Sequence, residues 1–233
     1  MSIPIFICNR NLLTWPKNAV EWFNKIPDLR PIIIDNDSTY QPLLEWYKNC
    51  PCEVKYHKTN GGPFVAWTGY VDETVKGNKQ PLYAVTDPDL DFSNIPLDMF
   101  DKIKELYESF EFTVNKIGVS LEIEGLPENP YAQNAKQWEM QFWPKPITTR
   151  KDKDLCVPVR FAAIDTTFAV YCYGLGGKRS TNSNLRMDRP YTAKHLPWYE
   201  DLNGNNEEYN YYLSHVQGSW SCWGNKFKKY RGK

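Results

Sequence analysis

Short apolar runs rich in β-branched and aromatic residues alternate along the chain with longer segments that carry one apolar face. Apolar runs of this kind predict strands, and they cover residues 3–8, 31–35, 53–57, 82–87, 116–123 and 160–171. Apolar residues at helical spacing predict helices over residues 16–26, 41–49, 62–77 and 96–110. Because strands that alternate with helices are typical of βαβ units, we expect an α/β fold with a mostly parallel central sheet flanked by helices.

The alternating pattern loosens beyond about residue 125, where loops rich in Pro, Trp and Asn interrupt the apolar runs. A chain of 233 residues, of which 41 % are hydrophobic, is within the size range of one domain with one core. We therefore expect a single domain over residues 1–218, with halves at 1–125 and 126–218. A basic, aromatic tail follows at 219–233.

Polar residues gather where the predicted strands end. The clusters are "CNRN" (8–11), "DNDSTY" (35–40), "TNGGP" (59–63) and "TDPDLD" (86–91). The carboxyl ends of parallel strands lie along one edge of a sheet, and open α/β sheets bind their ligands outside that edge. The sequence therefore predicts a binding site built from these clusters.

The stretch "AVTDPDLDFSNIPLD" (84–98) places Asp87, Asp89 and Asp91 at alternate positions. A calcium loop of the EF-hand type needs Gly at its sixth position, Glu at its twelfth and a helix before it. Phe92 and Asp98 occupy those two positions, and a predicted strand precedes them. The calcium loop is therefore excluded on three counts.

Two interpretations of the acidic stretch stay open. In one, Pro88 starts an ordinary turn and the aspartates are solvated or cap the next helix. In the other, a buried strand carries Asp87 and Asp89 to the sheet edge, where paired carboxylates are costly without a cation. Mg²⁺ and Mn²⁺ suit such a site, because Mg²⁺ takes one or two carboxylates and completes its shell with water and phosphates. The second interpretation predicts a nucleotide-diphosphate site, with Asp91 and Asp98 serving the turn and the helix start.

Charge and cysteine content narrow the class of protein. Basic and acidic side chains number 28 each, so the net charge is zero and we expect no nucleic-acid partner. The six cysteines form no C-x-x-C pair, and a chain of this size does not need disulfides, so reduced thiols are expected. The N-terminal run does not fit a secretory signal, and no run approaches the ~20 apolar residues of a membrane span. We expect a cytoplasmic protein, with or without attachment to a membrane surface.

Four segments, in their order along the chain, resemble those of nucleotide-sugar glycosyltransferases of the glycosyltransferase A fold, near glycosyltransferase family 2. "PIFICNRN" resembles the first strand and its loop, and "IIIDNDST" resembles the acidic loop after the second strand. "TNGGP" resembles the Asn-Gly segment and "VTDPDLD" the D-x-D motif. The resemblance implies a single Rossmann-like domain whose residues 1–125 bind the nucleotide sugar and whose residues 126–218 face the acceptor.

The resemblance also implies roles for individual residues. Asp35 and Asn36 would contact the base or ribose of the donor, and Asn9 and Arg10 would line the same pocket. From its pattern alone, Asp35 is equally a turn-forming residue. Enzymes of this fold often bring a C-terminal His onto the metal, and His195 is suitably placed, although a lone His is more often structural. The implied nucleotide-sugar-binding residues are Asn9, Arg10, Asp35, Asn36, Asn60, Gly61 and Asp87, and the implied ligands of Mn²⁺ or Mg²⁺ are Asp87, Asp89 and His195.

The acidic pair that serves as catalytic base in family 2 has no clear copy in this chain. Asp165 is the first candidate, because an acid inside the apolar run "RFAAIDTTFAVY" needs a partner or a purpose. Glu122 is the second candidate, and hydrogen bonds from Thr166 or Thr167 are the alternative explanation for Asp165. The basic residues that either balance the departing diphosphate or are solvated are Lys194, Arg186 and Arg189.

The implied function is a metal-dependent transfer of a sugar from a nucleotide diphosphate sugar, with a UDP-sugar expected, to a hydroxyl of a glycan or lipid-linked glycan. Two other classes stay open. A noncatalytic carbohydrate-binding protein is favoured by the aromatic residues, and a nucleotidyltransferase also places paired aspartates beside a divalent cation. The tail "SWSCWGNKFKKYRGK" either packs its Trp220 and Trp223 as an ordinary terminus or contacts an anionic membrane peripherally through its basic residues.

Overall fold

The computed structural model describes residues 2–77, 81–145, 157–175, 184–216 and 221–231. Within these ranges the strands are β1 (Ile3–Asn9), β2 (Leu29–Asn36), β3 (Glu53–His57), β4 (Leu82–Thr86), β5 (Leu90–Asp91), β6 (Lys116–Leu121), β7 (Val159–Phe161), β8 (Phe168–Cys172) and β9 (Asn184–His195). The α-helices are α1 (Thr14–Phe23), α2 (Gln41–Tyr47), α3 (Tyr70–Val75), α4 (Met99–Ser109), α5 (Pro130–Glu139), α6 (Glu207–Ser214) and α7 (Cys222–Tyr230). Two short 3-10 helices are η1 (Gly62–Trp67) and η2 (Leu196–Tyr199).

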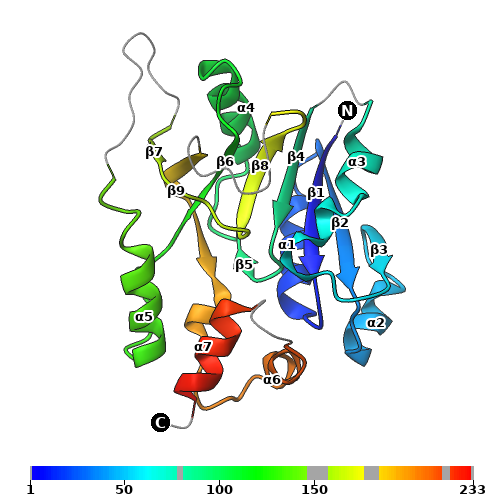
Figure 1. Ribbon diagram of the computed structural model, residues 1–233, viewed down its shortest axis with the longest axis vertical. Helices are drawn as coiled ribbons and strands as arrows, with labels where there is room; N and C mark the ends of the chain where they lie inside the picture. Colours follow the sequence, from blue (N-terminus) through cyan, green and yellow to red (C-terminus); the bar gives the residue numbers. More distant parts are fainter. Residues whose placement is uncertain (1, 78–80, 146–156, 176–183, 217–220, 232–233) are drawn as a thin grey trace.

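The strands form a mixed sheet in the order β3-β2-β1-β4-β8-β6-β9-β5, and β7 pairs with β9 (Figure 1). Strands β1, β2, β3 and β4 are parallel to their neighbours within this group, as are β6 and β9. Strand β8 is antiparallel to both β4 and β6, and β5 and β7 are antiparallel to β9. The predicted α/β class is confirmed, but the prediction of a mostly parallel sheet is wrong. Parallel neighbours need crossover connections, usually helical, and no helix lies among the described residues between β7 and β9.

Helices cover both faces of the parallel strands. Ile5 and Ile7 of β1 belong to the core shared with α1, α2 and α4, whereas Phe6 and Cys8 belong to the core shared with η1 and α3. This division follows from the period of two in a strand, and it explains why β1 is a continuous apolar run. The two layers leave the carboxyl ends of β1, β2 and β4 at a common edge of the sheet.

The predicted strand at 160–171 is two strands, β7 and β8, because residues 162–167 leave the sheet between them. Lys116 holds this excursion through its Nζ, which donates to the carbonyl oxygen of Ile164 at 2.8 Å. Strand β8 approaches β6 closely at Gly118, where a Cβ would lie 2.3 Å from the carbonyl oxygen of Phe168. The close approach therefore requires the glycine.

Strand β9 has no counterpart among the predicted strands, because charged residues interrupt its apolar pattern. Its register against β6 shifts, so that Val119 pairs with Met187 but the next residue, Ser120, pairs with Thr192. Residues 188–191 form a bulge at this shift, and the end of β9 then pairs with β5, where Leu90 is opposite His195. One strand thus connects the middle of the sheet to the segment that follows Asp89.

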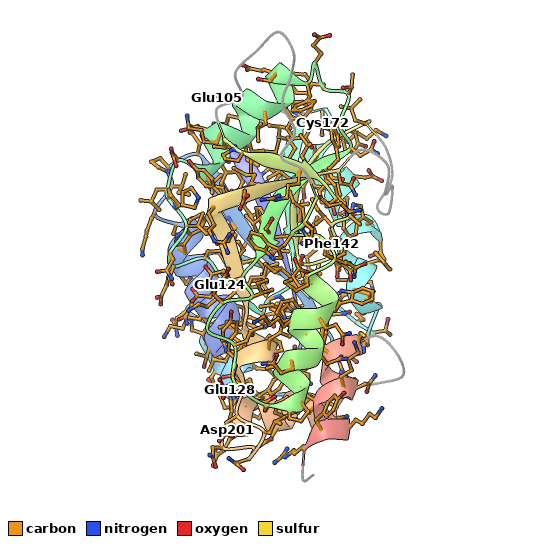
Figure 2. The ribbon with its side chains drawn as sticks, turned by 90° about the vertical axis from the view of Figure 1, so that its left-hand side faces the viewer. Glu105, Glu124, Glu128, Phe142, Cys172 and Asp201 are labelled. Atoms are coloured by element: carbon orange, nitrogen blue, oxygen red, sulfur yellow. The ribbon has the colours of Figure 1, made fainter. Side chains whose placement is uncertain are left out.

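Helices α6 and α7 lie together at one end of the molecule (Figure 1), and α7 lies beside α5 (Figure 2). Phe227 of α7 is 1 % exposed, with its ring centroid 5.2 Å from that of Tyr131 in α5 and 5.1 Å from that of Tyr209 in α6. Residues 221–231 of the predicted tail are therefore packed on the domain, and Trp220 lies outside the described residues. Membrane contact through the basic side chains of α7 stays a prediction. Among the described helices, none has the length and apolar character needed to cross a bilayer.

Candidate active site

A cavity of about 200 Å³ lies at the edge where β1, β2 and β4 end. Segments from the whole length of the chain line it, including the loop between β7 and β8 and the helices α6 and α7. The predicted site residues that line this cavity are Arg10, Asn36, Asn60, Asp87, Asp89, Asp165 and His195. The structure therefore brings together candidates for metal, donor and base from both halves of the sequence.

Asp87 lies directly after β4, where β8 begins beside it. Its backbone N–H donates to the carbonyl oxygen of Thr167 at 2.8 Å, and its Oδ2 accepts from the hydroxyl of Thr166 at 2.9 Å. Burial, the neighbouring charge of Asp89 and that of Asp165 raise the pKa of Asp87 well above its usual range, while the Thr166 hydrogen bond partly offsets the rise. Clustered carboxylates of this kind gain from a nearby cation.

Backbone pairing between β5 and β9 places Asp89 beside His195. The N–H of Leu196 donates to the carbonyl oxygen of Asp89 at 2.9 Å, and His195 Nε2 lies 3.7 Å from Asp89 Oδ2, which is too long for a hydrogen bond. Burial raises the pKa of Asp89, partly offset by His195, and burial lowers the pKa of His195 despite the acidic neighbours. The neutral imidazole, the form that binds metals, is therefore favoured.

Asp89 and His195 each have one buried polar atom without a hydrogen-bond partner. Asp89 Oδ1 and His195 Nδ1 are buried without a hydrogen bond. In the described part of the chain, no three His, Cys, Asp or Glu side chains converge closely enough to hold an ion by themselves. Mg²⁺, however, needs only one or two carboxylates when water and phosphates fill its remaining positions. The donor set fits a divalent cation that shares its shell with a bound ligand.

Arg10 and Asn36 line the cavity from the ends of β1 and β2. Arg10 donates from Nη1 to the carbonyl oxygen of His215 at 2.5 Å, and its Nε is buried without a partner. Asn36 donates to Asn60 Oδ1 at 3.2 Å and accepts from the N–H of Gly61 at 2.7 Å. Asn36 thus holds the Asn-Gly segment in place, while Arg10 supplies positive charge to the cavity.

Asn9 and Asp35 are buried beneath the cavity and do not line it. Tyr47 joins them: its hydroxyl donates to Asp35 Oδ2 at 3.0 Å and accepts from Asn9 Nδ2 at 2.9 Å. Asp35 Oδ1 also accepts from the N–H of Ser38 at 3.1 Å. These contacts match the turn-forming interpretation of Asp35.

Gly61 and Glu122 also lie outside the cavity lining, although Gly62 belongs to it. Glu122 accepts from the hydroxyl of Thr192 at 3.2 Å, whereas Asp165 is exposed at the cavity. Of the two predicted bases, Asp165 is the one that faces the clustered aspartates. Thr166, considered as a partner of Asp165, donates to Asp87 instead.

The basic residues predicted near the diphosphate are engaged elsewhere. Arg186 is buried in an ion pair with Glu139, and Arg189 pairs with Glu124 at the surface. Lys194 lies over the ring of Tyr199, 5.5 Å from its centroid. None of the three predicted cations is among the residues that line the cavity.

The remaining aspartates of the acidic stretch have local roles. Asp91 Oδ1 accepts from the N–H of Ser93 at 2.8 Å, as expected for a turn. Asp98 precedes the first residue of α4, but its side chain does not cap the helix and accepts instead from the hydroxyl of Tyr191 at 3.0 Å.

Helices α6 and α7 supply a wall that sequence reasoning missed. Tyr209 and Tyr212 of α6 and Trp223 of α7 line the cavity, and the Trp223 ring lies 5.2 Å from that of Trp198. The spacing of the two tyrosines was the available signal, since residues three apart share a helix face. Glu208 anchors α6 to the start of α1: its Oε1 accepts from the N–H groups of residues 13 and 14, at 2.7 and 2.9 Å.

No family model and no curated protein sequence matches this chain. Its fold is similar to that of TarS residues 1–349 of S. aureus, with a TM-score of 0.50 and 13 % identity over 84 % of this chain and 61 % of that one. A mannosyltransferase from Pyrobaculum calidifontis, solved with GDP-Man and Mn²⁺, gives a TM-score of 0.48 and 6 % identity over 91 % of this chain and 59 % of that one. Sugar transferases are thus among the structural neighbours, and the chain spans about 61 % of the TarS segment. At these identities the likeness concerns the fold.

Proposed function

We propose that the protein transfers a sugar from a nucleotide diphosphate sugar to a hydroxyl of a glycan acceptor. The observation that carries the proposal is the pair Asp87 and Asp89, which lie with His195 and Arg10 in one cavity at the sheet edge. The fold adds support, because TarS residues 1–349 of similar fold are also solved in complex with UDP-GlcNAc. A UDP-sugar is accordingly the expected donor.

Asp89 and His195, with Asp87 beside them, are the residues that would hold Mn²⁺ or Mg²⁺. This assignment is supported by the unpartnered Asp89 Oδ1 and by the lowered pKa of His195, which favours the neutral imidazole. When bound, a divalent cation stabilises negative charge on a departing diphosphate. Arg10, which follows the neighbouring strand β1, would also stabilise that charge, because its buried Nε has no hydrogen-bond partner and can donate to a phosphate oxygen.

Asp165 acts on the acceptor in this proposal. Its carboxylate takes the proton from the acceptor hydroxyl while that oxygen attacks the anomeric carbon, and the nucleotide diphosphate leaves with the electron pair of the broken bond. Asp165 is suited to the role because it is exposed at the cavity and is not held by the threonine next to it. Trp223 and Tyr212 provide apolar faces against which the sugar CH groups pack.

The test measures nucleotide binding and release. The protein should gain thermal stability with UDP plus Mn²⁺ and should release UDP from a UDP-sugar in the presence of glycan acceptors. The variant Asp89→Asn should lose both effects. Asp91→Asn is the matched control, because Asp91 is two residues away and its side chain bonds only to the N–H of Ser93 among the hydrogen bonds described.

Equal stabilisation and turnover by Asp89→Asn and the natural protein would contradict the proposal. Pyrophosphate release from a nucleoside triphosphate would support the nucleotidyltransferase alternative instead. Glycan binding that needs neither nucleotide nor metal would support the carbohydrate-binding alternative.

A further inference from the structure

Two cysteine thiols lie side by side, away from the cavity. Cys50 follows α2 and Cys52 precedes β3, and their Sγ atoms are 3.3 Å apart. Because a disulfide bond is about 2.05 Å long, the two sulfurs need to approach by little more than 1 Å to be joined.

The fold holds this pair in place. The N–H of Cys50 donates to the carbonyl oxygen of Tyr47 at 3.4 Å, and the amide of Asn24 donates to the carbonyl oxygen of Pro51 at 3.3 Å. Pro51 lies between the two cysteines, and its ring fixes its own φ. Folding therefore orders the segment in advance, so closing a bond between the thiols costs little further chain entropy.

The pair is also accessible and chemically asymmetric. Both cysteines are partly exposed, whereas Cys8 and Cys172 are buried. The hydrogen bond between the two thiols lowers the pKa of Cys50 and raises that of Cys52. Since the thiolate is the nucleophile in disulfide exchange, the lowered pKa of Cys50 favours it as the first nucleophile.

We propose that Cys50 and Cys52 form a reversible dithiol–disulfide couple that a low-molecular-weight disulfide oxidises in the folded protein. The Cys50 thiolate attacks one sulfur of the reagent, whose S–S bond breaks as one thiolate leaves. Cys52 then gives up its proton and attacks the Cys50 sulfur, and the second thiolate leaves. The two cysteines lose two electrons and two protons in total, and the reagent gains them as two thiols.

This modification site is independent of the proposed sugar transfer, and its test does not use that activity. The full chain is reduced, freed of reductant and incubated with oxidised glutathione, and the remaining thiols are blocked with iodoacetamide in denaturant. Trypsin cuts after Lys48 and Lys55, so residues 49–55 ("NCPCEVK") carry this pair and no other cysteine. This peptide should lose both alkylation sites and the mass of two hydrogens, and dithiothreitol should restore both sites.

Two variants sharpen the result. Cys50→Ser leaves one thiol, so its peptide should be alkylated or carry one glutathione and should never show the loss of two hydrogens. Cys172→Ser removes a buried cysteine elsewhere and should leave the oxidation of residues 49–55 unchanged. The proposal is overturned if the peptide from the natural chain keeps two alkyl groups, or carries glutathione on both cysteines, after the incubation.

Discussion

Glu208 connects the C-terminal helix α6 to the first helix, α1. Its contacts allow us to predict how much stability the protein loses when the side chain is removed. Helix α1 has no side-chain cap of its own and no acidic residue in its first turn. Glu208 of α6 takes over that role, because its carboxylate accepts from the N–H groups of Leu13 and Thr14 and from the Thr14 hydroxyl at 2.7 Å. The cap of α1 is thus supplied from about 195 residues further along the chain.

The expected cost of Glu208→Ala follows from these contacts. Loss of a helix N-cap costs about 0.5–2 kcal/mol, and a hydrogen bond to a charged acceptor contributes about 1.5–3 kcal/mol. The two figures describe the same contacts, and because the contact to Thr14 is exposed we expect a cost below the upper end of the range they span, about 2 kcal/mol. For a chain of this size that corresponds to a fall in Tm of roughly 4–8 °C.

Glu207→Ala is the matched control. Glu207 is the preceding residue, carries the same charge in the same first turn of α6, and is exposed. Both variants lose the same favourable interaction with the dipole of α6, so the difference between their free energies of unfolding isolates the contact with α1. Thermal unfolding by circular dichroism measures that difference.

A double-mutant cycle adds a second criterion. Thr14→Ala removes the hydroxyl that donates to Glu208 Oε2, so the effects of Thr14→Ala and Glu208→Ala should be non-additive by at least about 0.5 kcal/mol. The reasoning is refuted if Glu208→Ala and Glu207→Ala unfold at the same temperature, or if the two sites prove additive.

Two further predictions concern the cavity. Asp165→Asn should lower kcat for sugar transfer by about 10²–10⁴-fold, which is the usual contribution of a general base. Nucleotide binding, measured in thermal-shift assays, should be unchanged. A loss of binding equal to the loss of rate would argue against a role of Asp165 as base. Burial raises the pKa of the Cys8 thiol to about 12, so iodoacetamide should alkylate exposed Cys222 near pH 8 and leave Cys8 untouched until the pH approaches 12. Peptide mass spectrometry measures both cysteines at once, and equal labelling at pH 8 would contradict the expected burial.

The sequence predicted most elements of the N-terminal half because they have a clear local signal. The exceptions are the predicted helix at 62–77, which is the 3-10 helix η1 followed by α3, and the two-residue strand β5, which was not predicted. Buried parallel strands are continuous apolar runs, so β1, β2 and β4 were recognised, as was the edge at which they end. The partly exposed edge strand β3 was recognised from its β-branched and aromatic residues. The prediction that Asp87 and Asp89 belong to the site followed from their place at that edge. The same reasoning could not tell which polar residues at the edge face the cavity and which, like Asn9 and Asp35, are buried beneath it by Tyr47.

The C-terminal half was harder because its order depends on contacts distant in sequence. A run such as 160–171 is equally apolar whether it forms one strand or two, and only the partners of β7 and β8 decide where it divides. Strand β9 carries Arg186, whose charge is compatible with burial only because Glu139 of α5 meets it. No local sequence pattern predicts an ion-pair partner that is 47 residues away.

The bulge at residues 188–191 of β9 also determines where this strand can accept an inserted residue. An extra residue inside the bulge would enlarge a segment that already has no counterpart in β6, leaving the residues on either side in register. An extra residue between Thr192 and His195 would instead turn every following side chain to the opposite face and carry the imidazole away from Asp89. We therefore expect insertions to be tolerated within residues 188–191 and excluded between Thr192 and His195.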